Sequence, residues 1–152
     1  MTAKTTLVFD LEVYRDYFLA GFLNHETGNV RQFEMWPAGE GDAEHGFEEA
    51  QPLDRVTLHQ IIERYRLVSF NGNNYDIPVL SAALKGATCA QLKEISDKII
   101  KNNLKPWNLG IEPVRCDHID IFEVAPGMAS LKIYGGRLHC PKSCRFAHEW
   151  SP

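Results

Sequence analysis

The stretch LVFDLEVY, residues 7–14, has the pattern of a buried strand that carries acids near its end. Apolar residues lead into Asp10, Leu11 is again apolar, and Glu12 adds a second carboxylate. Side chains two residues apart in a strand point to the same face, so we expect Asp10 and Glu12 to lie side by side. Two adjacent negative charges repel each other unless a positive group lies between them. The pair therefore indicates a site that binds a cation.

The composition is typical of one globular domain, with 152 residues, of which 44% are hydrophobic and 24% are charged. No apolar run approaches the roughly 20 residues of a membrane-spanning helix, and the N-terminus lacks the apolar region of a signal peptide. We therefore expect a soluble, cytoplasmic protein with no membrane partner and with reduced cysteines. The net charge of −4 means that a nucleic acid would have to be bound by local Lys and Arg groups or through bound cations.

Predicted strands and helices alternate along the chain, which indicates an α/β domain with a mixed sheet. Three consecutive strands come first, most simply as an antiparallel meander, and the polar stretch 37–52 is a predicted loop. Gly135 and Gly136 are expected to interrupt the last helix. The predicted strands cover residues 5–10, 16–24, 30–36, 66–70 and 114–122, and the predicted helices cover 53–65, 77–86, 88–103 and 129–138.

A second unusual stretch, SFNGNNYDIPVL at residues 69–80, places Asn and Gly residues directly after a buried strand. The chain must turn there, because these residue types tolerate the positive φ angles of tight turns. Asp76 follows at the start of a predicted helix. One interpretation makes it the N-cap of that helix. The other makes it a third carboxylate that meets Asp10 and Glu12, since polar groups at the carboxyl ends of strands converge in α/β sheets.

The two motifs FDLE and NGNNYD, in this order and about sixty residues apart, resemble the first two motifs of the DEDD-type 3′–5′ exonucleases of the ribonuclease H-like superfamily. The similarity is closest to the proofreading domains of family-B DNA polymerases and to phage-type exonucleases. The segment HIDIFEV…SLKIYGGRL resembles the next strand and helix of that family, so the resemblance covers roughly residues 5–140. It implies a mixed sheet with three antiparallel strands first and helices on both faces. We expect an exonuclease-like domain over 1–142 and a tail over 143–152.

The resemblance implies a two-metal site in which Asp10, Glu12 and Asp76 hold two divalent ions. Hard oxygen ligands favour Mg²⁺ or Mn²⁺. The implied reaction is hydrolysis of phosphodiester bonds at the 3′ end of single-stranded DNA. A polymerase or another replication protein is the implied protein partner, and the compartment is the host cytoplasm if the chain is phage-encoded.

Four further residues are implied to contact the terminal nucleotide. Asn71 is expected to hydrogen-bond near it, and Tyr75 and Phe70 are expected to stack or pack beside it. Leu11 has two interpretations, a wedge against the terminal base or an ordinary core residue.

The chain departs from the family pattern in its last motif, Tyr-x-x-x-Asp or His followed by Asp, which is absent after Lys142. Asp120 and Glu149 are the candidate substitutes for the fourth acid, although Asp120 also resembles a structural position of the family. We therefore expect a shortened chain with impaired activity. The alternative is a non-catalytic ribonuclease H-like module that binds nucleic acid or a protein partner.

The tail HCPKSCRFAH also carries a possible zinc-binding pattern. Adjacent His and Cys residues are awkward ligands for one ion, so we expect free cysteines and no zinc. The residues of this pattern are His139, Cys140, Cys144 and His148, while Cys89 and Cys116 are predicted to be buried apolar thiols.

Overall fold

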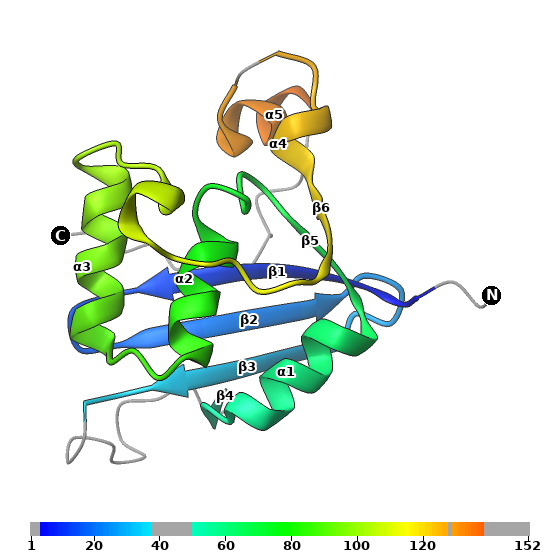
Figure 1. Ribbon diagram of the computed structural model, residues 1–152. Coiled ribbons are helices and arrows are strands. Elements are labelled where there is room, and N and C mark those ends of the chain that lie inside the picture. The colour runs from blue at the N-terminus through cyan, green and yellow to red at the C-terminus, as the bar shows by residue number, and fades with distance from the viewer. Residues whose placement is uncertain (1–3, 38–49, 128, 139–152) are drawn as a thin grey trace, which may run out of the picture.

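A mixed sheet of six strands runs through the centre of the molecule (Figure 1). The structure is a computed structural model that describes residues 4–37, 50–127 and 129–138. The strands follow the order β4-β3-β2-β1-β5-β6 across the sheet. They are β1 (Thr6–Val13), β2 (Phe18–Asn24), β3 (Val30–Met35), β4 (Ala50–Pro52), β5 (Arg66–Ser69) and β6 (Asp117–Asp120). The helices are α1 (Arg55–Arg64), α2 (Asp76–Leu84), α3 (Cys89–Ile100), α4 (Ile121–Val124), α5 (Leu131–Arg137) and a 3-10 helix, η1 (Pro106–Leu109).

Strands β1, β2 and β3 form the antiparallel meander that the sequence predicts. Gly28 has a φ of 75° in the turn between β2 and β3, a left-handed conformation that favours glycine. β5 lies parallel to β1, and β6 lies parallel to β5. The predicted mixed α/β sheet that begins with three antiparallel strands is confirmed.

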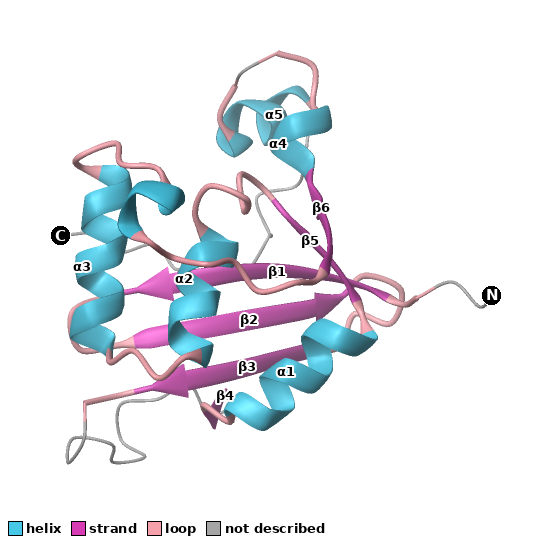
Figure 2. Cartoon of the chain, in the orientation of Figure 1, coloured by secondary structure: helices cyan, strands magenta, loops and turns pink. Residues whose placement is uncertain are grey.

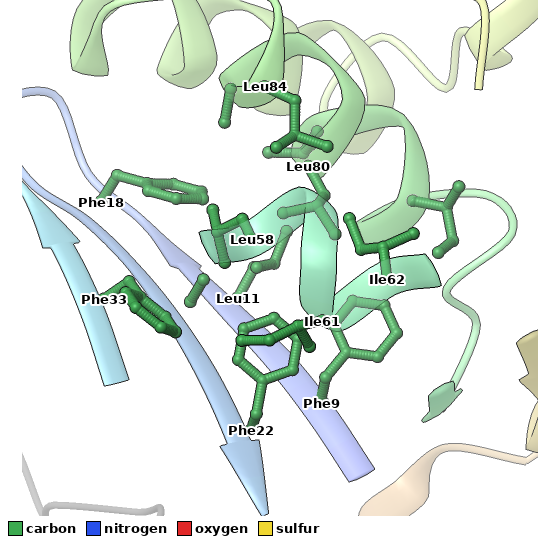
Figure 3. Close-up of a cluster of buried hydrophobic side chains, with 14 of the residues drawn as sticks. Phe9, Leu11, Phe18, Phe22, Phe33, Leu58, Ile61, Ile62, Leu80 and Leu84 are labelled. Carbon is green, nitrogen blue, oxygen red and sulfur yellow. The ribbon is translucent and has the colours of Figure 1, made fainter. Parts of the chain in front are cut away.

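The core lies between the sheet and the helices α1 and α2 (Figure 3). Burial alternates along β1, so that one face of the strand supplies apolar side chains to the core while the other face, which carries Asp10 and Glu12, is exposed. Burial of each large apolar side chain contributes about 1.5–3 kcal/mol. The packing of β1 therefore determines which way its acids point. The labelled core side chains are Phe9, Leu11, Phe18, Phe22, Phe33, Leu58, Ile61, Ile62, Leu80 and Leu84.

Helices α1, α2 and α3 cover one face of the sheet, and α4 and α5 lie beyond the end of β6 (Figure 2). On the opposite face, the strand register aligns apolar side chains in one row across the sheet. Three of them stay exposed, with Val8 at 39%, Val30 at 43% and Ile119 at 40%. The predicted helices on both faces are therefore found on one face within the described ranges.

Two predicted boundaries are wrong because pairing and capping override the local pattern. The predicted loop 37–52 contains β4, which pairs in parallel with β3 through Gln32 and Ala50. The strand predicted over 114–122 is shorter in the structure, where β6 covers only Asp117–Asp120 and α4 begins at Ile121. The Asp120 carboxylate accepts a hydrogen bond from the backbone N–H of Phe122 and so caps α4.

The expected interruption of the last helix is also wrong, because α5 includes both Gly135 and Gly136. Glycine lowers helix stability by about 1 kcal/mol relative to alanine. The Tyr134 hydroxyl, within the same helix, donates to the backbone carbonyls of Pro126 and Gly127 and ties α5 to the segment before it. This tertiary contact accounts for a helix that local propensity does not favour.

Cys89 is buried and Cys116 is half-buried, and both are free thiols, as predicted. Within the described part of the chain, no helix is long and apolar enough to cross a membrane. The tail residues in the predictions lie outside the described residues; they are His139, Cys140, Cys144, His148 and Glu149.

Candidate metal centre

The acids of β1 lie where one edge of the strand has no partner among the described strands. β5 has four residues and β1 has eight, so β5 pairs with β1 only from Thr6 to Val8. Beyond Val8 the chain of β5 has already turned away towards α2. Asp10 and Glu12 therefore lie beside an open edge, with exposed side chains.

The turn between β5 and α2 folds tightly because of its Asn and Gly residues. Asn71 has a φ of 62°, a left-handed conformation in which Asn is several-fold enriched. A Cβ placed on Gly72 would lie 1.8 Å from the Oγ atom of Ser69, so any larger residue there would force its neighbours to shift. The turn that the sequence predicts is thus set by close packing against the end of β5.

This turn delivers Asp76 to the open edge of β1. Asp76 is the first residue of α2 and is only 4% exposed. The N-cap of α2 is Tyr75, so the interpretation of Asp76 as the N-cap is wrong. The Asp76 carboxylate instead interacts with the backbone N–H of Leu11 in β1.

Loss of hydration raises the pKa values of all three acids, and the charge of Asp10 adds to the shifts of Glu12 and Asp76. The pKa of Asp76 rises to about 8, chiefly because burial disfavours the charged form and next because Asp10 is negatively charged. Burial also raises the pKa of Asp10. The pKa of Glu12 is raised by burial and by the charge of Asp10. No cation among the described residues contributes to these shifts, so the negative charge of the three acids is not offset.

The donor chemistry of these acids suits a hard divalent cation. Carboxylate oxygens are the protein ligands that Mg²⁺ and Mn²⁺ prefer, and a bound cation would offset the repulsion. Over residues 4–37, 50–127 and 129–138, however, no group of three or more His, Cys, Asp or Glu side chains is arranged to hold a metal ion. Asp10, Glu12 and Asp76 thus suit a divalent metal by their donor chemistry, whereas the described geometry does not gather them into one ligand set.

Asp120 lies near the site, but backbone N–H groups already hydrogen-bond to its carboxylate. Its buried carboxylate accepts hydrogen bonds from the N–H groups of Asn71 at 2.7 Å, Asn73 at 2.9 Å and Phe122 at 3.0 Å. Its charge still contributes to the raised pKa of Asp76. Asp120 therefore holds the turn that leads to Asp76, which agrees with its predicted structural position.

His118 braces the same turn, and the sequence reasoning missed it. Its Nε2 lies 2.9 Å from the Oγ of Ser69, and its Nδ1 lies 3.0 Å from the Oδ1 of Asn73. Burial lowers the pKa of His118, which favours the neutral ring. The amide of Asn73 in turn donates to Glu123 at 2.7 Å. The signal in the sequence is His118 two residues before Asp120 in a strand, which puts both on the same face.

The residues predicted to contact a nucleotide are not all directed towards the acids. Leu11 is 5% exposed and packs in the core, as its second interpretation has it. Phe70 packs edge-on against Phe122 and Tyr134. The Tyr75 hydroxyl is 2.9 Å from the Oγ of Ser96 on α3. The structure therefore brings the turn to the site but gives Phe70 and Tyr75 partners of their own.

Asn71 accepts a hydrogen bond from the side chain of Asn74 at 2.9 Å. Its own amide nitrogen has no hydrogen-bond partner among the described residues, so it is free to donate to a ligand.

The tyrosines of the turn between β1 and β2 also reach the site, and the sequence reasoning did not identify them. The Tyr14 hydroxyl donates to the Oε2 of Glu12 at 3.3 Å. The Tyr17 hydroxyl donates to the Oε2 of Glu34 at 3.3 Å. Their signal is the pair of aromatics in YRDY, directly after the strand that carries the acids.

A family model described as the RNase_H superfamily matches residues 7–135. The match spans β1 to α5 and includes the acids of β1, the turn before α2 and the start of β6. Neither a curated protein nor a solved structure matches the chain. The observed sheet, with its antiparallel meander and the parallel strands beside β1, agrees with a ribonuclease H-like fold. The chain belongs to the ribonuclease H superfamily.

Proposed function

We propose that the chain is a metal-dependent 3′–5′ exonuclease that hydrolyses phosphodiester bonds at DNA 3′ ends. The observation that carries this proposal is that, beside burial, the charge of Asp10 on β1 raises the pKa values of both Glu12 and the buried Asp76 of α2, with no cation among the described residues to offset it. Domains of the ribonuclease H superfamily are often nucleases, and such nucleases generally use divalent metals. The resemblance of FDLE and NGNNYD to exonuclease motifs supports the 3′–5′ polarity.

In this proposal, Asp10, Glu12 and Asp76 hold Mg²⁺ or Mn²⁺. Bound there, such ions would lower the pKa of an attacking water and offset the charge that develops on the leaving 3′ oxygen. Asp76 must lose its proton to act as a ligand, so metal binding releases a proton at neutral pH. The amide nitrogen of Asn71 donates to a sugar or phosphate oxygen of the terminal nucleotide. The His118 and Asp120 braces hold the turn that carries these groups.

A second candidate function is a non-catalytic module that binds nucleic acid or a protein partner. The observation in its favour is that Asp120, the only candidate fourth acid among the described residues, accepts three backbone hydrogen bonds. Misplacement of reacting groups by about 1 Å can slow a reaction roughly a hundredfold. If the chain is an exonuclease, the same observation implies slow turnover. We further propose that its protein partner is a polymerase or another replication protein and that it acts in the cytoplasm.

Metal binding and hydrolysis are tested together. Calorimetry with Mn²⁺ is expected to detect binding to the wild type and not to Asp10→Ala or Asp76→Ala. The same variants should lose release of the 3′ label from end-labelled single-stranded DNA, while a 5′ label stays on long products. Glu94→Gln, which removes a surface carboxylate paired with Lys98 on α3, is the matched control and should behave as the wild type.

Equal Mn²⁺ affinity in the wild type and the Asp10 variant would end the metal-site proposal. Metal binding without hydrolysis would favour the non-catalytic module. Release of a 5′ label first would contradict the polarity.

A further inference from the structure

Three aromatic rings form a contiguous row at one end of the sheet, next to the acids. The row starts at Tyr14, in the turn between β1 and β2, where the N–H of Tyr14 donates to the carbonyl of Tyr17 at 2.8 Å. The ring centres of Tyr14 and Tyr17 are 6.3 Å apart with an interplanar angle of 32°. Tyr17 continues the row to Trp36, after β3, at 4.4 Å and 47°. The row therefore crosses the ends of three strands.

The row begins at the proposed metal site. The Tyr14 hydroxyl donates to the Oε2 of Glu12 at 3.3 Å. The first ring of the row therefore contacts one of the proposed metal ligands.

The outer ring of the row is accessible. Tyr14 is 49% exposed, whereas Tyr17 and Trp36 are half-buried. The hydrogen bond from Tyr17 to Glu34 fixes the middle ring from the β3 side. Hydrogen bonds to Glu12 and Glu34 thus position two of the three rings, Tyr14 and Tyr17.

Positive charge is present at the same turn. Arg15 is exposed and takes part in no ion pair with another described residue. Aromatic faces that alternate with a free guanidinium are the groups that bind unpaired bases and the phosphates between them. Asp16 and Glu34 flank the row and disfavour phosphates there, so the bases would have to face the rings.

We propose that Tyr14, Tyr17 and Trp36, with Arg15, form a stacking track for unpaired bases of a single strand whose 3′ end lies at the acids. This proposal rests on the proposed nuclease function and adds the way in which the strand leaves the site. The track favours single strands over duplexes, because the bases of a duplex are stacked on one another and expose their faces only at the ends. It also predicts a minimum strand length, since a very short strand occupies the acids without reaching Tyr14.

The test measures binding of 5′-fluorescein-labelled oligothymidylates of two and twelve nucleotides by fluorescence anisotropy, in Ca²⁺ to limit hydrolysis. Loss of one stacked base weakens binding roughly tenfold. Tyr14→Leu should therefore weaken binding of the long strand about tenfold and leave the short strand unchanged. Tyr14→Phe keeps the ring, removes the hydroxyl that contacts Glu12, and should bind both strands as the wild type does. Trp107→Leu removes an exposed aromatic on η1, far from the row in sequence, and should have no effect.

A scan of single abasic nucleotides from the 3′ end gives a position-specific readout. One or two abasic positions should weaken binding to the wild type and cause no further loss in Tyr14→Leu. The track is overturned by equal losses for short and long strands, by no loss at any length, by an equal loss in Trp107→Leu, or by failure of any single strand to bind.

Hydrolysis of the twelve-nucleotide strand in Mn²⁺ is measured separately, with Asp10→Ala as the inactive comparison. Tyr14-dependent binding without hydrolysis would uphold the track and end the exonuclease proposal. Hydrolysis that does not depend on Tyr14 would uphold the exonuclease and end the track.

Discussion

At the residue scale, Asp76 is a buried acid whose charged form is unstable without a partner. Its pKa in the folded protein is about 8, against an ordinary value of 3.8. Between these values the folded state binds a proton that the unfolded state has lost. The free energy of unfolding of the metal-free protein should therefore fall as the pH rises from about 4 to about 8.

Asp76→Asn should remove most of this pH dependence, because the amide has no charged form. Urea unfolding in EDTA at several pH values measures it, and the variant should be more stable than the wild type at pH 8. Residues of functional sites often lower stability, so replacing one can stabilise a protein while it removes function. Parallel pH curves for the two proteins would contradict the account of Asp76.

Substitution of Asp120 should lower the free energy of unfolding, whereas substitution of Asp76 should raise it. Both acids are equally buried, at 4% exposure. Its carboxylate satisfies three backbone N–H groups, and each buried group left unsatisfied costs about 1–3 kcal/mol. Asp120→Ala should lower the free energy of unfolding by roughly 3 kcal/mol or more in EDTA. If the variant were instead more stable than the wild type, Asp120 would belong with the metal ligands.

At the element scale, the turn from β5 to α2 is the part of the fold that makes the site. Gly72→Ala would force a Cβ to within 1.8 Å of the Ser69 Oγ and 3.1 Å of the His118 Nε2. Overpacking of this kind typically costs about 1–3 kcal/mol. The variant should lose stability by this amount and also lose Mn²⁺ affinity, because the turn positions Asp76.

Gly21→Ala is the matched control, since its added Cβ would meet only the Asp10 carbonyl at 3.9 Å, an ordinary contact. Adding Ser69→Ala to Gly72→Ala removes the nearest clashing atom and should restore part of the stability, a non-additive effect. Denaturant unfolding of the wild type, Ser69→Ala, Gly72→Ala and the double variant measures this effect, with Gly21→Ala as a fifth protein. Strict additivity would show that the clash with Ser69 does not cause the loss.

At the scale of the whole molecule, metal binding should stabilise the fold by mass action. Metal at 100 times its Kd adds about 2.7 kcal/mol to the free energy of unfolding. For a domain of this size that corresponds to a rise of roughly 5–10 °C in Tm. The wild type should show this rise with Mn²⁺, and Asp10→Ala should not. The same rise in both proteins would place the metal elsewhere.

Local patterns predicted most of the elements because they depend on residues close in the chain. The alternation of apolar side chains in 7–14 predicts β1 and the common face of Asp10 and Glu12. The helix 53–65 is confirmed as α1, whose N-cap Asp54 accepts from two backbone N–H groups. Elements that depend on distant partners were missed, among them β4, which exists through its pairing with β3.

Strand period and turn chemistry act over a few residues, so local patterns were enough to predict the order of most elements, the turn before Asp76 and the common face of Asp10 and Glu12. The hydrogen bonds by which Asp120 holds the turn at Asn71, and the row of Tyr14, Tyr17 and Trp36, become visible only in the folded chain. These contacts join different elements, and Asn71 and Asp120 are 49 positions apart in the chain. Which partner a buried carboxylate finds depends on how the strands and turns pack, and that is set by the whole core.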